Sequence, residues 1–101
     1  MSIYEGDTIR MESKFTISAA REIRERLDEI QFLAVKHRSD NGELFDIIDH
    51  LARVGGMFAD VKVQELEGCV QTADPQDYIL KKLSIAYSLM KRYDEKSEKV
   101  L

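Results

Sequence analysis

The chain has 101 residues, of which 44% are hydrophobic and 34% are charged, with five glycines, one proline and no tryptophan. This composition is typical of one globular helical domain and excludes a disordered or fibrous chain. The formal net charge of −4 gives no electrostatic support for non-specific binding to nucleic acid.

The sequence also indicates the cellular compartment in which we expect the protein. Cys69 is the only cysteine, so an internal disulfide cannot form and a reducing cytoplasm is the expected location. The first residues, "MSIYEGDTIR", lack the apolar core of a secretion signal, and no apolar run reaches the roughly 18 residues that a membrane span needs. We therefore expect a cytoplasmic protein without a membrane segment, folded as a single domain over residues 1–101.

Residues 8–17, "TIRMESKFTI", alternate between apolar and polar side chains. Ile9, Met11, Phe15 and Ile17 fall on one side, and this period of two is typical of a half-buried strand. Because a single strand leaves backbone groups unpaired, we expect it to pair with "SIY" or with its copy in a second subunit. Residues 1–17 are predicted to form a strand or arm whose apolar side belongs to an oligomer or partner interface.

A first helix is predicted over residues 18–38. Ala20, Ile23, Leu27, Ile30 and Ala34 step by three and four residues, which is helical spacing. Ser18 is the predicted N-cap, and the turn-forming "SDNG" at residues 39–42 is predicted to follow the helix.

A second helix is predicted over residues 43–68, with Gly68 at its end. Each glycine inside a helix costs about 1 kcal/mol relative to alanine, so the adjacent pair in "ARVGGMFAD" needs a reason. The pair falls in phase with two alanines, which favours a continuous helix against which another helix packs closely. A kink or break in the helix and a ligand that presses on the backbone are the alternatives. This small-residue row is a predicted interface, and its members are Ala52, Gly55, Gly56 and Ala59.

A third helix is predicted over residues 75–96, because Asp74 and Pro75 form an N-cap followed by proline at the first helical position. The expected fold is mainly α: a three-helix bundle, made of a hairpin and a third helix, with the short N-terminal strand or arm, completed by oligomerisation. The predicted core comprises Ile23, Leu27, Ile30, Leu44, Ile47, Leu51, Phe58, Leu83, Ala86 and Met90.

Two carboxylate pairs carry the chemistry that the sequence suggests. The segments "EIRE" and "ELFDIIDHLARV" resemble the motifs of the all-α nucleoside triphosphate pyrophosphohydrolases of the MazG-like class. The resemblance implies that Glu22, Glu25, Glu43 and Asp46 bind Mg²⁺ and catalyse nucleotide hydrolysis. Outside it, the sequence has no Cys-x-x-Cys or His-Glu-x-x-His pattern, so we expect no metal site and no cofactor.

The order of one strand and two helices resembles the ribbon-helix-helix repressors, whose paired strands lie in the DNA major groove. This resemblance implies that Arg10, Lys14 and Thr16 contact DNA, although Glu12 lies in the middle of the same side.

We expect a non-enzymatic, homo-oligomeric protein, with a dimer favoured, that binds or regulates through a protein or small-ligand partner. A monomer of this size buries only part of the apolar strand side and of the small-residue row. DNA binding and nucleotide hydrolysis remain the alternative functions.

Overall fold

The computed structural model describes residues 14–100, and three helices make up almost all of this part. Helix α2 spans Ile17–Lys36, α3 spans Gly42–Leu66 and α4 spans Pro75–Val100. The described part contains no β-strand, so the mainly α class is confirmed. Residues 8–13 of the predicted strand lie outside the described residues, whereas Ile17 belongs to α2 and not to a strand.

Helix α2 begins one residue earlier than predicted, and its N-cap is Thr16 rather than Ser18. The backbone of Thr16 is extended, with φ −95° and ψ 159°, and its Oγ1 accepts a hydrogen bond from the Ala19 amide at 3.0 Å. The hydroxyl thus satisfies an amide that has no partner within the helix. Both residues are of capping type, and the alternation of residues 8–17 hid the earlier start.

The C-terminal end of α3 and the start of α4 have the caps that the sequence predicts at Gly68 and Asp74. Gly68 has a positive φ of 103°, its amide donates to the Glu65 carbonyl, and the Cys69 amide donates to the Gln64 carbonyl, both at 3.0 Å. This double hydrogen bond is a Schellman motif, which needs glycine in the left-handed conformation. At α4, the Asp74 carboxylate accepts from the Asp77 amide at 3.0 Å, which confirms the predicted cap.

Helix α3 continues through Gly55 and Gly56, and neither glycine has a positive φ. A Cβ built on Gly55 would lie only 2.9 Å from Cδ1 of Leu27 in α2, whereas one on Gly56 would lie 3.7 Å from the Asp28 carboxylate. The interpretation of close helix packing is confirmed, and the tight point is Gly55. A helix break at the glycines is excluded.

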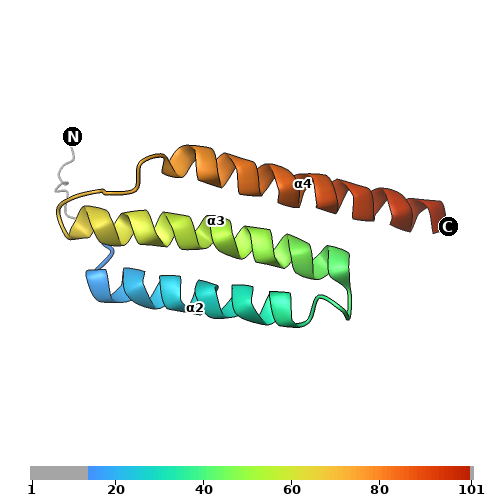
Figure 1. Ribbon diagram of the computed structural model, residues 1–101, viewed down its shortest axis with the longest axis horizontal. Helices are drawn as coiled ribbons and strands as arrows, with labels where there is room; N and C mark the ends of the chain where they lie inside the picture. The colour runs from blue at the N-terminus through green and yellow to red at the C-terminus, as the bar shows by residue number, and fades with distance from the viewer. Residues whose placement is uncertain (1–13, 101) are drawn as a thin grey trace.

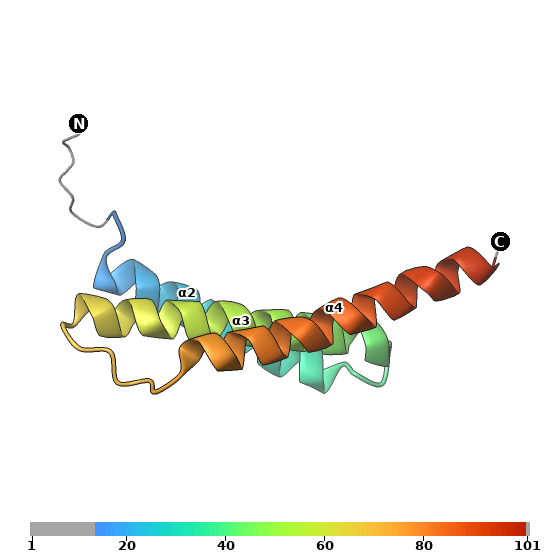
Figure 2. The same cartoon turned by 90° about the horizontal axis from the view of Figure 1, so that it is seen from above.

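The three helices form a single layer with α3 in the middle (Figure 1). They run antiparallel in sequence order, and within the described residues α2 and α4 do not contact each other. The molecule measures 54 × 29 × 23 Å, and Figure 2 shows the layer from above, with the C-terminal part of α4 extending past the other helices. The predicted three-helix arrangement is therefore confirmed, and the three helices form an open layer.

This layer arrangement corrects the predicted core. Of the ten predicted core residues, Ile47 and Ala86 are buried, whereas Leu27 and Leu44 are only half-buried. The other six are exposed because a layer leaves one side of every helix uncovered: Ile23, Ile30, Leu51, Phe58, Leu83 and Met90. The buried apolar side chains are mostly small: Ala20, Ala34, Ile47, Ala52, Ala59, Val63 and Ala86.

Candidate interaction surface

Phe58 of α3 marks the side of the layer that we call the apolar face. Its side chain lines two grooves, one between α2 and α3 and one between α3 and α4, so both grooves open on the same side of the layer. Phe58 is 62% exposed, which is unusual for an aromatic residue at the centre of a helical layer. The apolar face therefore extends over all three helices.

The groove between α2 and α3 has a volume of about 430 Å³. Gly55 lies in its wall, where the missing side chain leaves room for Leu27, and Lys62 is its charged member. The Lys62 Nζ lies 5.6 Å from the centre of the Phe15 ring, which is within cation–π distance. The lining residues are Phe15, Ala20, Ile23, Leu27, Gly55, Phe58, Ala59 and Lys62.

The contact between α3 and α4 leaves two further grooves, of about 410 Å³ and 240 Å³. The first surrounds the start of α4 and is lined by Phe58, Val61, Pro75, Gln76, Ile79 and Leu80. The second surrounds the buried Ala86 and is lined by Ile47, Leu51, Leu83, Ala86, Tyr87 and Met90. Among the described residues that line the three grooves there is no carboxylate, and Lys62 is the only charged one.

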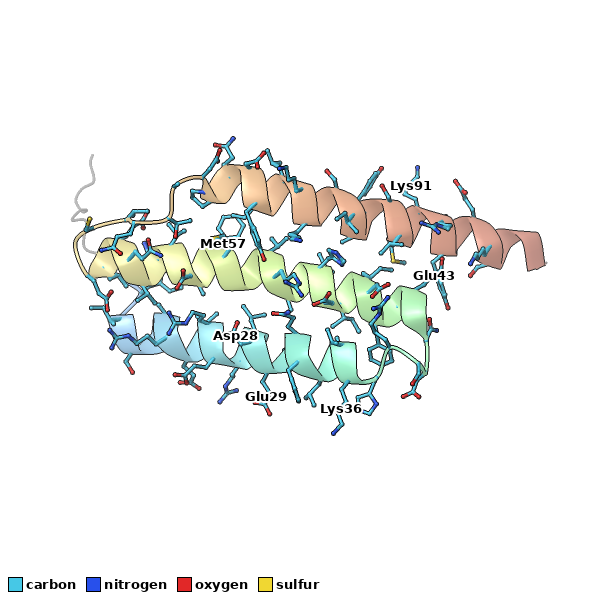
Figure 3. The ribbon with its side chains drawn as sticks, in the orientation of Figure 1. Asp28, Glu29, Lys36, Glu43, Met57 and Lys91 are labelled. Atoms are coloured by element: carbon cyan, nitrogen blue, oxygen red, sulfur yellow. The ribbon has the colours of Figure 1, made fainter. Side chains whose placement is uncertain are left out.

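The opposite side of the layer, which we call the polar face, carries an open cleft of about 350 Å³. Asp60 lies there because two residues along a helix correspond to about 200° of rotation from Phe58. The Arg24 guanidinium donates to Asp60 at 2.9 Å, and Figure 3 shows Asp28 directed from α2 toward α3. The lining residues are Arg24, Asp28, Gln31, Arg53, Gly56, Met57, Asp60 and Tyr78.

Arg53 connects α3 to α4 on the polar face. Burial alone would lower the pKa of the Arg53 guanidinium, but hydrogen bonds with Tyr78 and Asp49 and the negative charge of Asp49 raise it above its ordinary range. The Arg53 Nε lies 3.1 Å from the carboxylate of Asp49, whose side chain is buried. The raised pKa means that the folded protein favours the charged guanidinium. The stability that this adds is fully present below the ordinary pKa of arginine, and it is lost only as the pH rises through the raised pKa. Arg53 therefore remains charged at every ordinary pH.

The loop between α3 and α4 is held by the side-chain amide of Gln64. Its oxygen accepts from the backbone amides of Gln71 at 2.7 Å and Thr72 at 3.0 Å. Its nitrogen donates to the Thr72 hydroxyl at 2.8 Å and to Asp60 at 3.0 Å. Nothing in the sequence pattern indicated this role, because a glutamine near a helix end is common on solvated surfaces.

The predicted interface residues have different environments in the structure. Ala52 and Ala59 are buried, seven residues apart on the side of α3 that packs against α2. Phe15 is exposed beside the α2–α3 groove, and Ile17 is half-buried in the first turn of α2. Ile9 and Met11 lie outside the described residues. The small-residue row thus serves the contact between α2 and α3 within the chain.

The residues implied in DNA contact are only partly described. Lys14 is exposed just before α2, and Arg10 lies outside the described residues. The Thr16 hydroxyl accepts the N-cap hydrogen bond described above, so Thr16 has a structural role at the start of α2.

The two carboxylate pairs lie in different parts of the hairpin. Glu22 pairs with Arg26 of its own helix at 2.8 Å. Asp46 pairs with Arg38 at 2.8 Å, and Glu43 pairs with Lys96 at 3.1 Å. Glu25 lies near the middle of α2, whereas Glu43 and Asp46 lie at the start of α3, beside the end of α2, so the pairs are separated along the helix axes. Among the described residues, no three acidic, histidine or cysteine side chains lie close enough to hold a metal ion.

No protein-family model, curated protein or solved structure matches this chain. None of the described helices has the length and hydrophobicity that a membrane crossing requires. The fold and surface define the chain as an open three-helix layer with one apolar and one polar face. Leu80 and Tyr87, whose helical spacing from Leu83 places them beside the same side of the third helix, are exposed in the structure.

Proposed function

We propose that the chain is a non-enzymatic binding protein of regulatory type that works as a homo-oligomer, with a dimer favoured. The single observation that carries the proposal is the exposed apolar face, which includes Ile23, Leu51, Phe58, Leu83 and Met90. Contiguous apolar surface on this scale marks interaction sites in folded proteins, because leaving it in water is costly.

The small internal core supports the same proposal. Within the described residues no large side chain is completely buried, and five of the seven buried apolar residues are alanines. A domain of about 100 residues needs substantial apolar burial to offset the conformational entropy lost on folding. Association that covers the apolar face supplies this burial, so folding and assembly are expected to be coupled.

The polar face remains available to a further partner in such an assembly. Most of its charged side chains are paired with one another, as Arg24 is with Asp60 and Arg53 is with Asp49. Such a surface suits reversible contacts with a protein or a small polar ligand, since its charges and hydrogen-bonding groups are only partly covered.

The proposal is tested by light scattering after gel filtration, over a dilution series into the low micromolar range. We expect at least twice the chain mass of 11.7 kDa and a urea midpoint that rises with protein concentration. A monomeric mass throughout would overturn the proposal. Thermal-shift experiments on the same preparation, with duplex DNA and with nucleoside triphosphates plus Mg²⁺, test the two alternative functions.

A further inference from the structure

A row of residues on α3 repeats with the spacing of a helix–helix seam. Leu44, Ile48, Leu51, Gly55, Phe58 and Lys62 step by 4, 3, 4, 3 and 4 residues, which is the spacing of the a and d positions of a heptad. Because α3 is the middle helix, this row, which we call the α3 row, follows the centre of the apolar face.

Three large members of the α3 row are exposed: Ile48, Leu51 and Phe58. Leu51 is 47% exposed, whereas its neighbour Ala52 is 5% exposed beneath α2. Ile48 is exposed, whereas its neighbour Ile47 is buried against α4. Helix α3 thus has three sides: one packs against α2, one packs against α4, and the described chain leaves the third exposed.

We infer that a second copy of this chain covers the apolar face, with the two α3 helices crossing antiparallel near Gly55. This inference rests on the proposed self-association and names its interface. The layer is 54 Å long and 29 Å wide, so one face is large enough for the about 800 Å² per partner that a stable interface buries.

The charge of the apolar face favours a second copy as the partner. A surface that pairs with itself must not place like charges opposite each other, and within residues 14–100 the grooves have no carboxylate and one cation in their lining. Their one cation, Lys62, has a carboxylate neighbour on its own helix, because its Nζ lies 3.5 Å from Glu65. A strongly basic partner would meet no carboxylate among the described residues of these grooves, and a strongly acidic one would meet only Lys62.

The antiparallel direction follows from the α3 row itself. In a parallel pair every residue of the row faces its own copy, so two Lys62 ammonium groups would be adjacent. In an antiparallel pair the two-fold axis passes between Val54 and Gly55, midway between Leu51 and Phe58. Phe58 of each copy then packs beside Leu51 of the other, once on each side of the two-fold axis.

The first test compares two exposed phenylalanines. Phe58→Asp places a charge in the centre of the apolar face, whereas Phe32→Asp changes a residue that is 67% exposed on the other side of α2 from Ile30. We expect Phe58→Asp to lose the oligomer, either as a monomer or by unfolding, and Phe32→Asp to keep the wild-type mass. An oligomer that survives Phe58→Asp overturns the inference but leaves the proposed function intact, whereas a monomeric wild type overturns both.

The second test is disulfide trapping in a Cys69→Ser background, since Cys69 is exposed. Residues 51 and 58 are two helical turns apart, about 10 Å, which is too far for a disulfide within one chain. We expect mild oxidation to cross-link an equimolar mixture of the Leu51→Cys and Phe58→Cys proteins, while each variant alone stays largely uncross-linked. Cross-linking of the separate variants, without an increase in the mixture, overturns the antiparallel crossing.

Discussion

The two neighbours of α3 are held by different means, although both are antiparallel helices of similar length. Helix α2 approaches closely at Gly55 over buried alanines, and the Arg24–Asp60 pair bridges the polar side of the contact at 2.9 Å. Among the described side chains of helix α4, the buried apolar one is Ala86. The contact between α3 and α4 leaves two grooves. The difference shows that the contact between α2 and α3 is tight, whereas the contact between α3 and α4 leaves more apolar surface open.

The largest effect is expected where α4 rests on α3. Ile47→Ala removes the large buried side chain beside Ala86 and should lower the free energy of unfolding by about 2–4 kcal/mol. The matched control is Ile85→Ala, an exposed isoleucine of α4, for which we expect a loss below about 1 kcal/mol. Urea unfolding at one fixed protein concentration measures both variants, and equal losses would contradict the burial of Ile47.

The next effect concerns the tight contact between α2 and α3. Gly55→Leu forces a side chain against Leu27, whose Cδ1 lies 2.9 Å from the Cβ position, and should cost about 1–3 kcal/mol. Gly56→Leu is the matched control. Its nearest neighbour is the Asp28 carboxylate, at 3.7 Å from the Cβ position, which is ordinary contact.

The measurement compares the urea midpoints of the Gly55→Leu and Gly56→Leu proteins. Leucine at position 56 gains up to about 1 kcal/mol of helix propensity over glycine and its Cβ meets no clash, so this variant should lose less stability than Gly55→Leu. A loss at position 56 equal to that at position 55 would show that both glycines lie under the crossing of α2. The sequence alone favoured close packing at the glycine pair but could not decide which glycine is the tight one.

Local signals in the sequence predicted most of the secondary structure. The signals at Gly68 and at Asp74 and Pro75 each act within one helical turn, and the structure confirms them. The predicted start of α2 was wrong by one residue. Thr16 and Ser18 are both capping residues, and the alternating pattern of residues 8–17 included Ile17. Errors of this size arise where two local patterns overlap.

Contacts between helices were less accessible to sequence reasoning. Helical periodicity shows that Leu51, Phe58 and Leu83 are apolar residues on helix faces, but it does not say whether a face meets its own chain or another. The prediction assigned them to the core of a three-helix bundle, whereas the structure exposes them on an open layer. The bridge between Arg24 and Asp60 joins residues 36 positions apart, and no local pattern encodes such a pair.

A smaller effect is expected at the loop that leads from α3 to α4. Gln64→Ala removes the acceptor for the Gln71 and Thr72 amides and should cost about 1–2 kcal/mol. Hydrogen exchange should accelerate at these two amides, while the amides in the middle of α3 change only with the global stability. Gln71→Ala, which keeps the backbone donor, is the control, and unchanged exchange in Gln64→Ala would contradict the role of this side chain.

The smallest effect is expected for the double variant Glu43→Gln and Asp46→Asn. The cations that pair with these carboxylates, Lys96 and Arg38, are more than half exposed and can return to water. Each lost pair should therefore cost about 0.3–1 kcal/mol, and less at high salt. Glu22→Gln and Glu25→Gln form the matched control, since the Mg²⁺ alternative requires all four carboxylates equally.

Pyrophosphate release from a panel of nucleoside triphosphates, with and without Mg²⁺, then separates a surface role from a catalytic one. We expect no Mg²⁺-dependent release by the wild type, because the two pairs lie apart along the helices and each has a cation partner within the chain. If Mg²⁺ binds, it must bring Glu25 toward Asp46 by sliding α2 along α3, which the close contact at Gly55 opposes. Metal-dependent release that both double variants abolish would show that this contact does slide, and would replace the binding function with hydrolysis.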